Sequence, residues 1–193
     1  MKILIGSNNK GKIEEYRALL GSNFDPLPLS ELGINLDVEE AGSTYEENAL
    51  IKLNFLKGKC NFPILTDDSG IEVECLHGRP GIYSARYAGD NATDDANIDK
   101  LLDELDGTSS RRAKFVCSIA YFDPTNNSEI IMCNGECEGE ILQDRRGVSG
   151  FGYDPIFYLP ILQRSFAELA KEEKNTLSHR YKAVRELLKR INI

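Results

Sequence analysis

A short polar segment near the N-terminus combines glycine with lysine, the residue types that a phosphate site most needs. The apolar run Ile3–Ile5 ends at Gly6, and Lys10 and Lys12 precede an amphipathic helical pattern that begins at Ile13. In a strand–loop–helix of this kind, glycine lets the backbone approach a ligand closely, and free N–H groups and the helix dipole favour an anion. The segment therefore predicts a polyphosphate site; the alternative is an ordinary strand–turn–helix without a ligand.

The same segment satisfies most of the P-loop pattern but departs from it at one position. The spacing from Gly6 to Gly11 and Lys12 matches, whereas Ile13 stands where that pattern requires serine or threonine. Without that hydroxyl the loop cannot bind Mg²⁺ in the manner of a P-loop. We therefore expect a phosphate loop of a different design, with its metal ion held elsewhere in the chain.

Carboxylates that could hold such a metal ion occur in two segments. Asp67 and Asp68 follow the short apolar run Pro63–Thr66, and Glu39 and Glu40 precede a predicted helix. A carboxylate at the end of a buried strand, close to a second one from another segment, is a common arrangement for Mg²⁺ beside a phosphate. Adjacent side chains of an extended segment point to opposite sides, so we expect the two aspartates to do different jobs.

Each acidic segment also has an interpretation without a metal ion. Residues 67–70, Asp-Asp-Ser-Gly, are typical of an Asx turn capped by Ser69. The Glu39–Glu40 pair can be a solvated acidic loop. Glu47 is a further candidate ligand, but a carboxylate in the first turn of a helix is explained equally well by the helix dipole.

An aromatic residue between two glycines could bind a nucleobase. Phe151 lies between Gly150 and Gly152, and Tyr153 and Asp154 follow directly. An aromatic ring on a flexible turn can stack on a purine, which is worth about 1–3 kcal/mol per base. The alternative is a tight turn that packs Phe151 into the hydrophobic core.

Two cationic side chains stand at the start of the last predicted helix. Ser178 is a suitable N-cap residue, which would place His179 and Arg180 in the first turn of that helix. Cations are mildly unfavourable there unless an anionic or acceptor-rich group lies nearby. Arginine suits a bidentate hydrogen bond to purine O6 and N7. A basic surface turn is the alternative.

Apolar spacing and capping residues predict mixed α and β elements around these groups. A first βα unit covers about residues 2–20, and Thr44 and Thr93 can each cap a helix, the first of which runs to about Lys59. The remaining expectations are an irregular stretch at 24–40, strands at 63–66, 71–75, 113–122 and 129–142, a turn at 67–70, a hairpin turn at 123–128, loops at 77–92 and 147–154, and a C-terminal helix. This order predicts an α/β fold with a mixed sheet.

Composition restricts the function classes. The chain has 193 residues, enough for one domain or for two lobes that share one core, and its formal net charge is −8. That charge argues against nonspecific binding of DNA or RNA, which needs a basic face, but allows a small nucleotide bound through local lysines and a divalent cation. The longest apolar runs are too short for a membrane span or a signal-peptide core, so we expect five reduced cysteines and a cytoplasmic protein.

Taken together, these segments resemble the inosine triphosphate pyrophosphatase family almost from end to end. The similarity rests on six motifs in the same order, at residues 7–12, 40–49, 67–70, 80–86, 151–155 and 174–180. Each motif alone is weak, but six in one order make chance implausible. The resemblance implies a single two-lobed domain over residues 1–193, with a long bent mixed sheet, an active cleft between the lobes and a homodimer.

The resemblance also implies an activity, which is hydrolysis of non-standard purine nucleoside triphosphates (ITP, dITP, XTP) to the monophosphate and pyrophosphate. This reaction would remove non-standard nucleotides from the cell's pool of nucleotide precursors. Asp68 would be the catalytic residue, and Glu40 and Asp68 would bind Mg²⁺, with Glu39 as the alternative to Glu40. The substrate-binding residues would be Ser7, Asn8, Asn9, Lys10, Gly11, Lys12, Ser69, Phe151, Gly152, Tyr153, Asp154, Lys174, His179 and Arg180.

Two other functions stay open on the sequence alone. A P-loop-like ATPase or kinase would release orthophosphate or phosphorylate an acceptor, and a nucleotide-sensing module would bind without turnover. Base selection has a physical basis, because a 6-keto purine accepts a hydrogen bond where adenine donates one. A pocket that offers donors there rejects adenine at a cost of about 1–3 kcal/mol. Guanine also carries O6, and the sequence does not reveal what excludes it.

Overall fold

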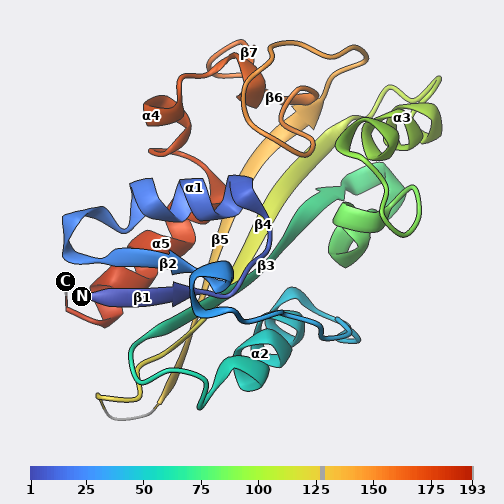
Figure 1. The fold of residues 1–193 in the computed structure, drawn as a ribbon. Coiled ribbons are helices and arrows are strands. Elements are labelled where there is room, and N and C mark those ends of the chain that lie inside the picture. Colours follow the sequence, from blue (N-terminus) through green and yellow to red (C-terminus); the bar gives the residue numbers. More distant parts are fainter. Residues whose placement is uncertain (127–128, 193) are drawn as a thin grey trace. The chain divides into compact units, whose positions relative to one another are not determined.

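A computed structural model of the chain describes residues 1–126 and 129–192 and contains a seven-stranded sheet with helices (Figure 1). The strand order is β2-β1-β3-β4-β5-β6-β7. Strand β1 pairs in parallel with β2 and β3, and β6 pairs antiparallel with β5 and β7, which confirms the predicted mixed α/β fold. The elements are β1 (Lys2–Ile5), α1 (Lys10–Leu19), β2 (Asp25–Pro28), α2 (Tyr45–Leu56), β3 (Ile64–Val73), α3 (Asp94–Glu104), β4 (Arg112–Phe122), β5 (Ile130–Ile141), β6 (Phe157–Leu159), β7 (Arg164–Ser165), α4 (Lys171–Lys174) and α5 (His179–Arg190).

The chain divides into two compact units by its internal contacts, and the first of its four passages between them falls inside β3, between Asp68 and Ser69. The first unit consists of Met1–Asp68, Cys117–Gly135 and His179–Ile193, and the second of Ser69–Val116 and Glu136–Ser178. The predicted active cleft between two lobes stays a prediction. No helix in the described ranges combines the length and the apolar character needed to cross a bilayer.

Alternate residues of the strands in the first unit enter two different hydrophobic clusters, as the two-residue period of a strand requires. Ile3 and Ile5 pack with α1 and α5, whereas Leu4 between them packs with α2. Strand β3 follows the same alternation, with Leu65 in the first cluster and Ile64 in the second. Helices therefore cover both faces, and a side chain's position along β3 decides which helices it meets.

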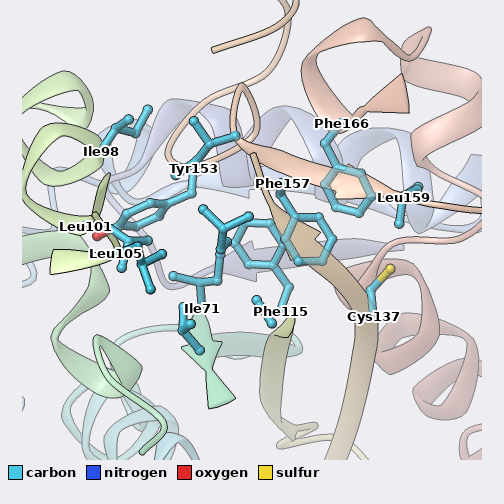
Figure 2. Close-up of a cluster of buried hydrophobic side chains, with 14 of the residues drawn as sticks. Ile71, Ile98, Leu101, Leu105, Phe115, Cys137, Tyr153, Phe157, Leu159 and Phe166 are labelled. Atoms are coloured by element: carbon cyan, nitrogen blue, oxygen red, sulfur yellow. The ribbon is translucent and has the colours of Figure 1, made fainter. Parts of the chain in front are cut away.

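The second unit is built around an aromatic cluster (Figure 2). The ring centroids of Phe115, Phe157 and Phe166 lie 4.5, 4.8 and 5.7 Å apart in tilted, edge-on and stacked pairs. Such separations are favourable for aromatic side chains. The apolar face of α3 and the ring of Tyr153 belong to the same cluster, which therefore fixes both segments in the unit.

The predicted helix caps at Thr44 and Thr93 are confirmed, and the cap expected at Ser178 stays a prediction. Thr44 caps α2 and Thr93 caps α3, each by accepting a hydrogen bond from a backbone N–H three residues later. Helix α1 begins earlier than its apolar pattern indicates, because the side chain of Asn9 caps it. Lys10 and Lys12 therefore belong to the first helical turn and not to a free loop.

Several local predictions are wrong because tertiary contacts override local signals. The predicted turn at residues 67–70 and the break before residue 71 are absent, since β3 runs unbroken from Ile64 to Val73 and its aspartates find partners on helices. The predicted irregular stretch contains β2, which pairs with β1 despite its prolines. Strands β6 and β7 and helix α4 had no clear sequence signal. The predicted hairpin turn at 123–128 includes residues outside the described part of the chain.

Strand β5 approaches α5 so closely that only glycine fits at position 135. A Cβ built on Gly135 would overlap the carbonyl oxygen of His179 and lie 2.5 Å from the backbone nitrogen of Ala183. We expect Gly135→Ala to lower the free energy of unfolding by about 1–3 kcal/mol through overpacking, as measured by urea unfolding. Glu138→Ala, at an exposed position of the same strand, should change it by less than about 0.5 kcal/mol. An unchanged stability for Gly135→Ala would contradict this packing.

Candidate active site

The two adjacent aspartates of β3 point to opposite faces of the strand. Leu65 packs with α1 and α5, so Asp67, two residues later, faces those helices. Thr66 donates a hydrogen bond from its hydroxyl to the carbonyl of Ala49 in α2, at 2.7 Å, so Asp68 faces α2. The expectation that the aspartates do different jobs is consistent with this arrangement.

Asp67 is buried between two cations. Its Oδ2 atom lies 3.1 Å from Lys12 Nζ and 3.4 Å from Arg180 Nη2, and accepts a long hydrogen bond of 3.8 Å from the Cys117 thiol. Burial by itself would raise the pKa of Asp67, but Lys12 and Arg180 outweigh burial and lower that pKa to about 2. Asp67 is thus ionised at neutral pH and holds the Lys12 ammonium beside β3.

The loop between β1 and α1 is shaped by its own side chains. Ser7 Oγ accepts a hydrogen bond from Asn9 N–H at 3.1 Å, and Asn9 Oδ1 accepts one from Lys12 N–H at 3.0 Å. These bonds start the helix at Lys10 and direct Lys12 toward β3. Among the other predicted phosphate-binding residues, Asn8 and Lys10 are exposed and Gly11 is half-buried.

Asp68 has a separate set of partners on α2. Its Oδ2 accepts a hydrogen bond of 3.0 Å from Asn48 Nδ2, and its Oδ1 lies 3.7 Å from Lys52 Nζ. Lys52 Nζ also lies 3.1 Å from Glu40 Oε1, so two carboxylates face one buried ammonium. Burial raises the pKa of Asp68, Lys52 and Lys12 oppose that rise, and Glu40 adds to it. The two neighbouring aspartates therefore have pKa shifts of opposite sign.

The acidic loop before α2 is fixed to the helix by hydrogen bonds. Asn48 Oδ1 accepts a bond of 2.9 Å from Gly42 N–H, and Glu47 accepts bonds from the N–H and hydroxyl of Ser43, which lower the pKa of Glu47. Glu47 thus serves to order the loop. Glu40 reaches Lys52, whereas Glu39 is exposed, so the geometry favours Glu40 over Glu39 as a site residue.

The first residues of α5 are buried, which excludes the interpretation as a basic surface turn. Arg180 is 1% exposed and pairs with Glu15 of α1 as well as with Asp67. His179 is 4% exposed. A cation in the first turn of a helix needs an anionic group nearby, and for Arg180 the carboxylates of Glu15 and Asp67 are those groups. Contacts of His179 and Arg180 with a base stay a prediction.

The aromatic turn lies in the second unit and is held by a buried carboxylate. Asp154 Oδ2 accepts a hydrogen bond of 3.0 Å from Phe151 N–H and lies 2.5 Å from Lys174 Nζ. Lys174 Nζ is 5.0 Å from the centroid of the Phe151 ring, within the range of a cation–π contact. Tyr153 points into the core and donates a hydrogen bond of 2.8 Å to the carbonyl of Ser84.

The structure gathers the predicted residues into two groups, one in each unit. Ser69 directly follows Asp68 on β3 and is half-buried. The first unit holds Ser7, Asn8, Asn9, Lys10, Gly11, Lys12, Glu40, Asp68, His179 and Arg180, and the second holds Ser69, Phe151, Gly152, Tyr153, Asp154 and Lys174.

Sequence reasoning missed Lys52 and Asn48, and it gave Asp67 no role of its own. Asn48 and Lys52 are four residues apart, so they share one face of α2. Both are buried beside apolar neighbours. Two polar residues at helical spacing within a buried face are the signal that could have identified them, because buried polar groups need partners.

The chain is similar in sequence to known proteins. A sequence model of the Ham1 family matches residues 3–190. A protein of Staphylococcus aureus (strain MRSA252) named dITP/XTP pyrophosphatase is 47% identical, over 95% of this chain and 92% of its own length. A protein of the same name from Halalkalibacterium halodurans is 46% identical, and the alignment covers 95% of this chain and 95% of that protein.

Solved structures agree with the sequence comparisons. The Ham1 protein of Staphylococcus aureus is 45% identical with a TM-score of 0.87, covering 100% of this chain and 98% of its own. A structure titled as the nucleoside-triphosphatase or dITP/XTP pyrophosphatase of Mycobacterium abscessus is 37% identical with a TM-score of 0.75, covering 97% of this chain and 99% of its own.

Opposite pKa shifts predict opposite contributions of the two aspartates to stability in acid. The pKa of Asp67 is about 2 in the folded chain, against an ordinary 3.8, so its ionisation stabilises the fold above about pH 4 and this contribution is lost as the pH falls toward 2. The shift corresponds to roughly 2 kcal/mol. Asp67→Asn should therefore flatten the loss of stability between pH 4 and pH 2, measured by urea unfolding with a chelator present.

Asp68→Asn is the matched comparison. Because the pKa of Asp68 is raised, its contribution is largest when the carboxyl is protonated and is lost as the pH rises through the raised pKa. Asp68→Asn should keep the acid-dependent loss caused by Asp67, and its stability relative to the native chain should improve as the pH rises. Equal slopes below pH 4 for Asp67→Asn and the native chain would contradict these assignments.

Proposed function

The chain belongs to the Ham1 family, and on this premise we propose that it hydrolyses non-standard purine nucleoside triphosphates such as dITP, XTP and ITP. The products are the nucleoside monophosphate and pyrophosphate. The activity removes such nucleotides from the precursor pool. The observation that carries the proposal is the pair of adjacent aspartates on β3, each facing a lysine from a different helix.

This pair suits a substrate that is a polyanion. Lys12, in the first turn of α1, offers an ammonium group beside backbone N–H groups at a helix N-terminus, where phosphate binds well. Lys52 supplies a second ammonium from the other face of β3. Phosphoryl transfer requires mainly positioning and neutralisation of charge, and these two lysines provide both.

The carboxylates beside Lys52 fit a hard divalent cation, and we propose Mg²⁺ bound by Glu40 and Asp68. The donors are all oxygen, and Glu40 and Asp68 lie close enough to share the Lys52 ammonium. No group of three or more acidic, histidine or cysteine side chains in the described ranges could hold a metal ion, so substrate and water oxygens would complete the coordination. When bound, the ion neutralises charge on the phosphate oxygens.

Asp68 is the residue that we propose to orient or deprotonate the attacking water. Its carboxylate is held by Asn48 on one side and faces Lys52 on the other, so its position is fixed. Ser69, the next residue on β3, is proposed to hold a phosphate oxygen or a water molecule of the metal ion.

The aromatic turn of the second unit is proposed to bind the base. Phe151 would stack on the purine, and Lys174, whose Nζ lies 5.0 Å from the centroid of that ring, would offer a hydrogen-bond donor to a 6-keto group. Adenine presents a donor at that position and would leave a buried donor without an acceptor. His179 and Arg180 are proposed to take part in base recognition, as the family resemblance implies.

We further propose that the enzyme acts in the cytoplasm as a homodimer, as the resemblance implies. All five cysteines are free thiols, which suits a reducing compartment. Neither nucleic acid nor a membrane is proposed as a partner, because the net charge is −8 and no basic surface was expected. Analytical ultracentrifugation at several concentrations tests the dimer.

Product identity tests the activity most directly. With Mg²⁺ present, dITP, XTP and ITP should each yield the monophosphate and pyrophosphate. ATP should be poorer in kcat/KM by about 5- to 150-fold, which corresponds to one unsatisfied donor. A coupled pyrophosphate assay combined with chromatography of the products measures both. Orthophosphate release would support an ATPase or kinase, and saturable binding without product would support a nucleotide sensor.

Carboxylate variants test the residue assignments. Asp68→Asn should lower kcat by about 100- to 10,000-fold, the usual contribution of a general base, while calorimetry still detects nucleotide binding. Glu40→Gln should raise the Mg²⁺ concentration needed for half-maximal rate, because it removes a ligand charge. Glu39→Gln is the matched control and should leave that concentration unchanged. Near-native turnover by Asp68→Asn, or equal effects of the two glutamate variants, would overturn these roles.

A further inference from the structure

The turn that carries Phe151 depends on two glycines with left-handed backbone conformations. Gly150 has φ of 82° and Gly152 has φ of 59°. Such conformations are accessible to glycine at no steric cost, but they also leave the free turn with many alternatives. The position of the Phe151 ring is therefore set by whatever holds the amide groups of this turn.

The core side of the turn is anchored by buried groups. Tyr153 is 5% exposed, and its hydroxyl donates to the carbonyl of Ser84 at 2.8 Å. The carbonyl of Asp154 accepts a hydrogen bond of 3.2 Å from Ala167 N–H, and the Asp154 side chain binds Phe151 N–H and Lys174. These contacts fix residues 153 and 154. In the peptide between Phe151 and Gly152, the carbonyl of Phe151 accepts a hydrogen bond of 3.3 Å from Asp154 N–H, so the Gly152 N–H is the group that is bound from outside the turn.

That peptide is held by a carboxylate from α3. Gly152 N–H donates a hydrogen bond of 2.6 Å to Asp94 Oδ2. Asp94 is the first residue of α3, whose position is fixed by the Thr93 cap and by its apolar face in the aromatic cluster. A hydrogen bond to an ionised acceptor is stronger than one between neutral groups. The rigid helix thus supplies the contact that the flexible turn lacks.

Asp95 follows Asp94 in the first turn of α3 and is also acidic, but its side chain makes a different contact. Asp95 Oδ1 lies 3.4 Å from Arg145 Nε, and the Gly152 amide is bound by Asp94. Both residues lie in the first turn of α3 and interact alike with the helix dipole. Any difference between their variants therefore reports the contact with the turn.

We propose that Asp94 is a positioning residue for base recognition, which acts by holding the Gly152 amide so that the Phe151 ring is ready to receive the purine. The inference rests on the proposed function, because it assumes that Phe151 stacks on the base. A turn ordered before binding loses less conformational freedom when the base docks, so its affinity is higher. Asp94 itself touches neither the phosphates nor the reacting atoms.

The test compares Asp94→Ala, Asp94→Asn and Asp95→Ala in steady-state assays of pyrophosphate release from ITP. Asp94→Ala should raise KM by about tenfold, the equivalent of one lost hydrogen bond, with kcat within about twofold of the native value. Asp94→Asn keeps an acceptor oxygen and should restore KM to within about threefold of native. Asp95→Ala should leave KM unchanged, although it removes the same helix-dipole charge.

Inorganic tripolyphosphate, which lacks a base, separates base positioning from general loosening of the fold. Its inhibition constant against ITP hydrolysis should be the same for Asp94→Ala and the native enzyme. A rise in that constant parallel to the rise in KM would overturn the proposal in favour of a structural role. An unchanged KM for Asp94→Ala, or Asp94→Asn as impaired as Asp94→Ala, would also overturn it. A native enzyme that releases no pyrophosphate would instead refute the proposed function, and with it this inference.

Discussion

Two adjacent carboxylates buried in the middle of one strand impose the main constraint on this fold. An unpaired buried charge is so costly that each carboxylate must find a cation or a hydrogen-bond donor. Because neighbouring strand residues face opposite ways, one layer of helices cannot serve both. The first unit meets this requirement with α1 and α5 around Asp67 and with α2 around Asp68. The arrangement that stabilises the strand also places two lysines beside it.

The two aspartates differ in their surroundings more than in their burial. Asp67 lies between Lys12 and Arg180, and its pKa falls to about 2, so it works as a fixed negative charge that orients the cations. Asp68 shares Lys52 with Glu40, and its pKa is raised. One residue type at two successive positions thus supplies a structural anion and a candidate base, because the helices that flank the strand carry different balances of charge.

The aromatic turn of the second unit follows the same principle on a smaller scale. A buried carboxylate, Asp154, organises the turn from within through Phe151 N–H and Lys174, while Asp94 holds it from α3. Glycines make the turn possible, and carboxylates select one conformation for it. In both units acidic side chains arrange the groups that would meet a nucleotide, which accounts for part of the acidic excess of the chain.

The sequence by itself determined the class of fold and the capped helices at Thr44 and Thr93, because these depend on periodicity and capping within a few residues. From side-chain chemistry it also named candidate residues for a phosphate and a metal ion, and these stay proposals. It misjudged residues 67–70 as a turn, since the local preference of Asp-Asp-Ser-Gly gives no sign of the helices that satisfy those side chains. It could not reveal that Lys12 pairs with Asp67, that Lys52 faces Asp68 and Glu40, or that Asp94 binds Gly152. Only the tertiary structure decided these pairings, because they join segments distant in the chain whose meeting depends on which face of a strand or helix each side chain occupies.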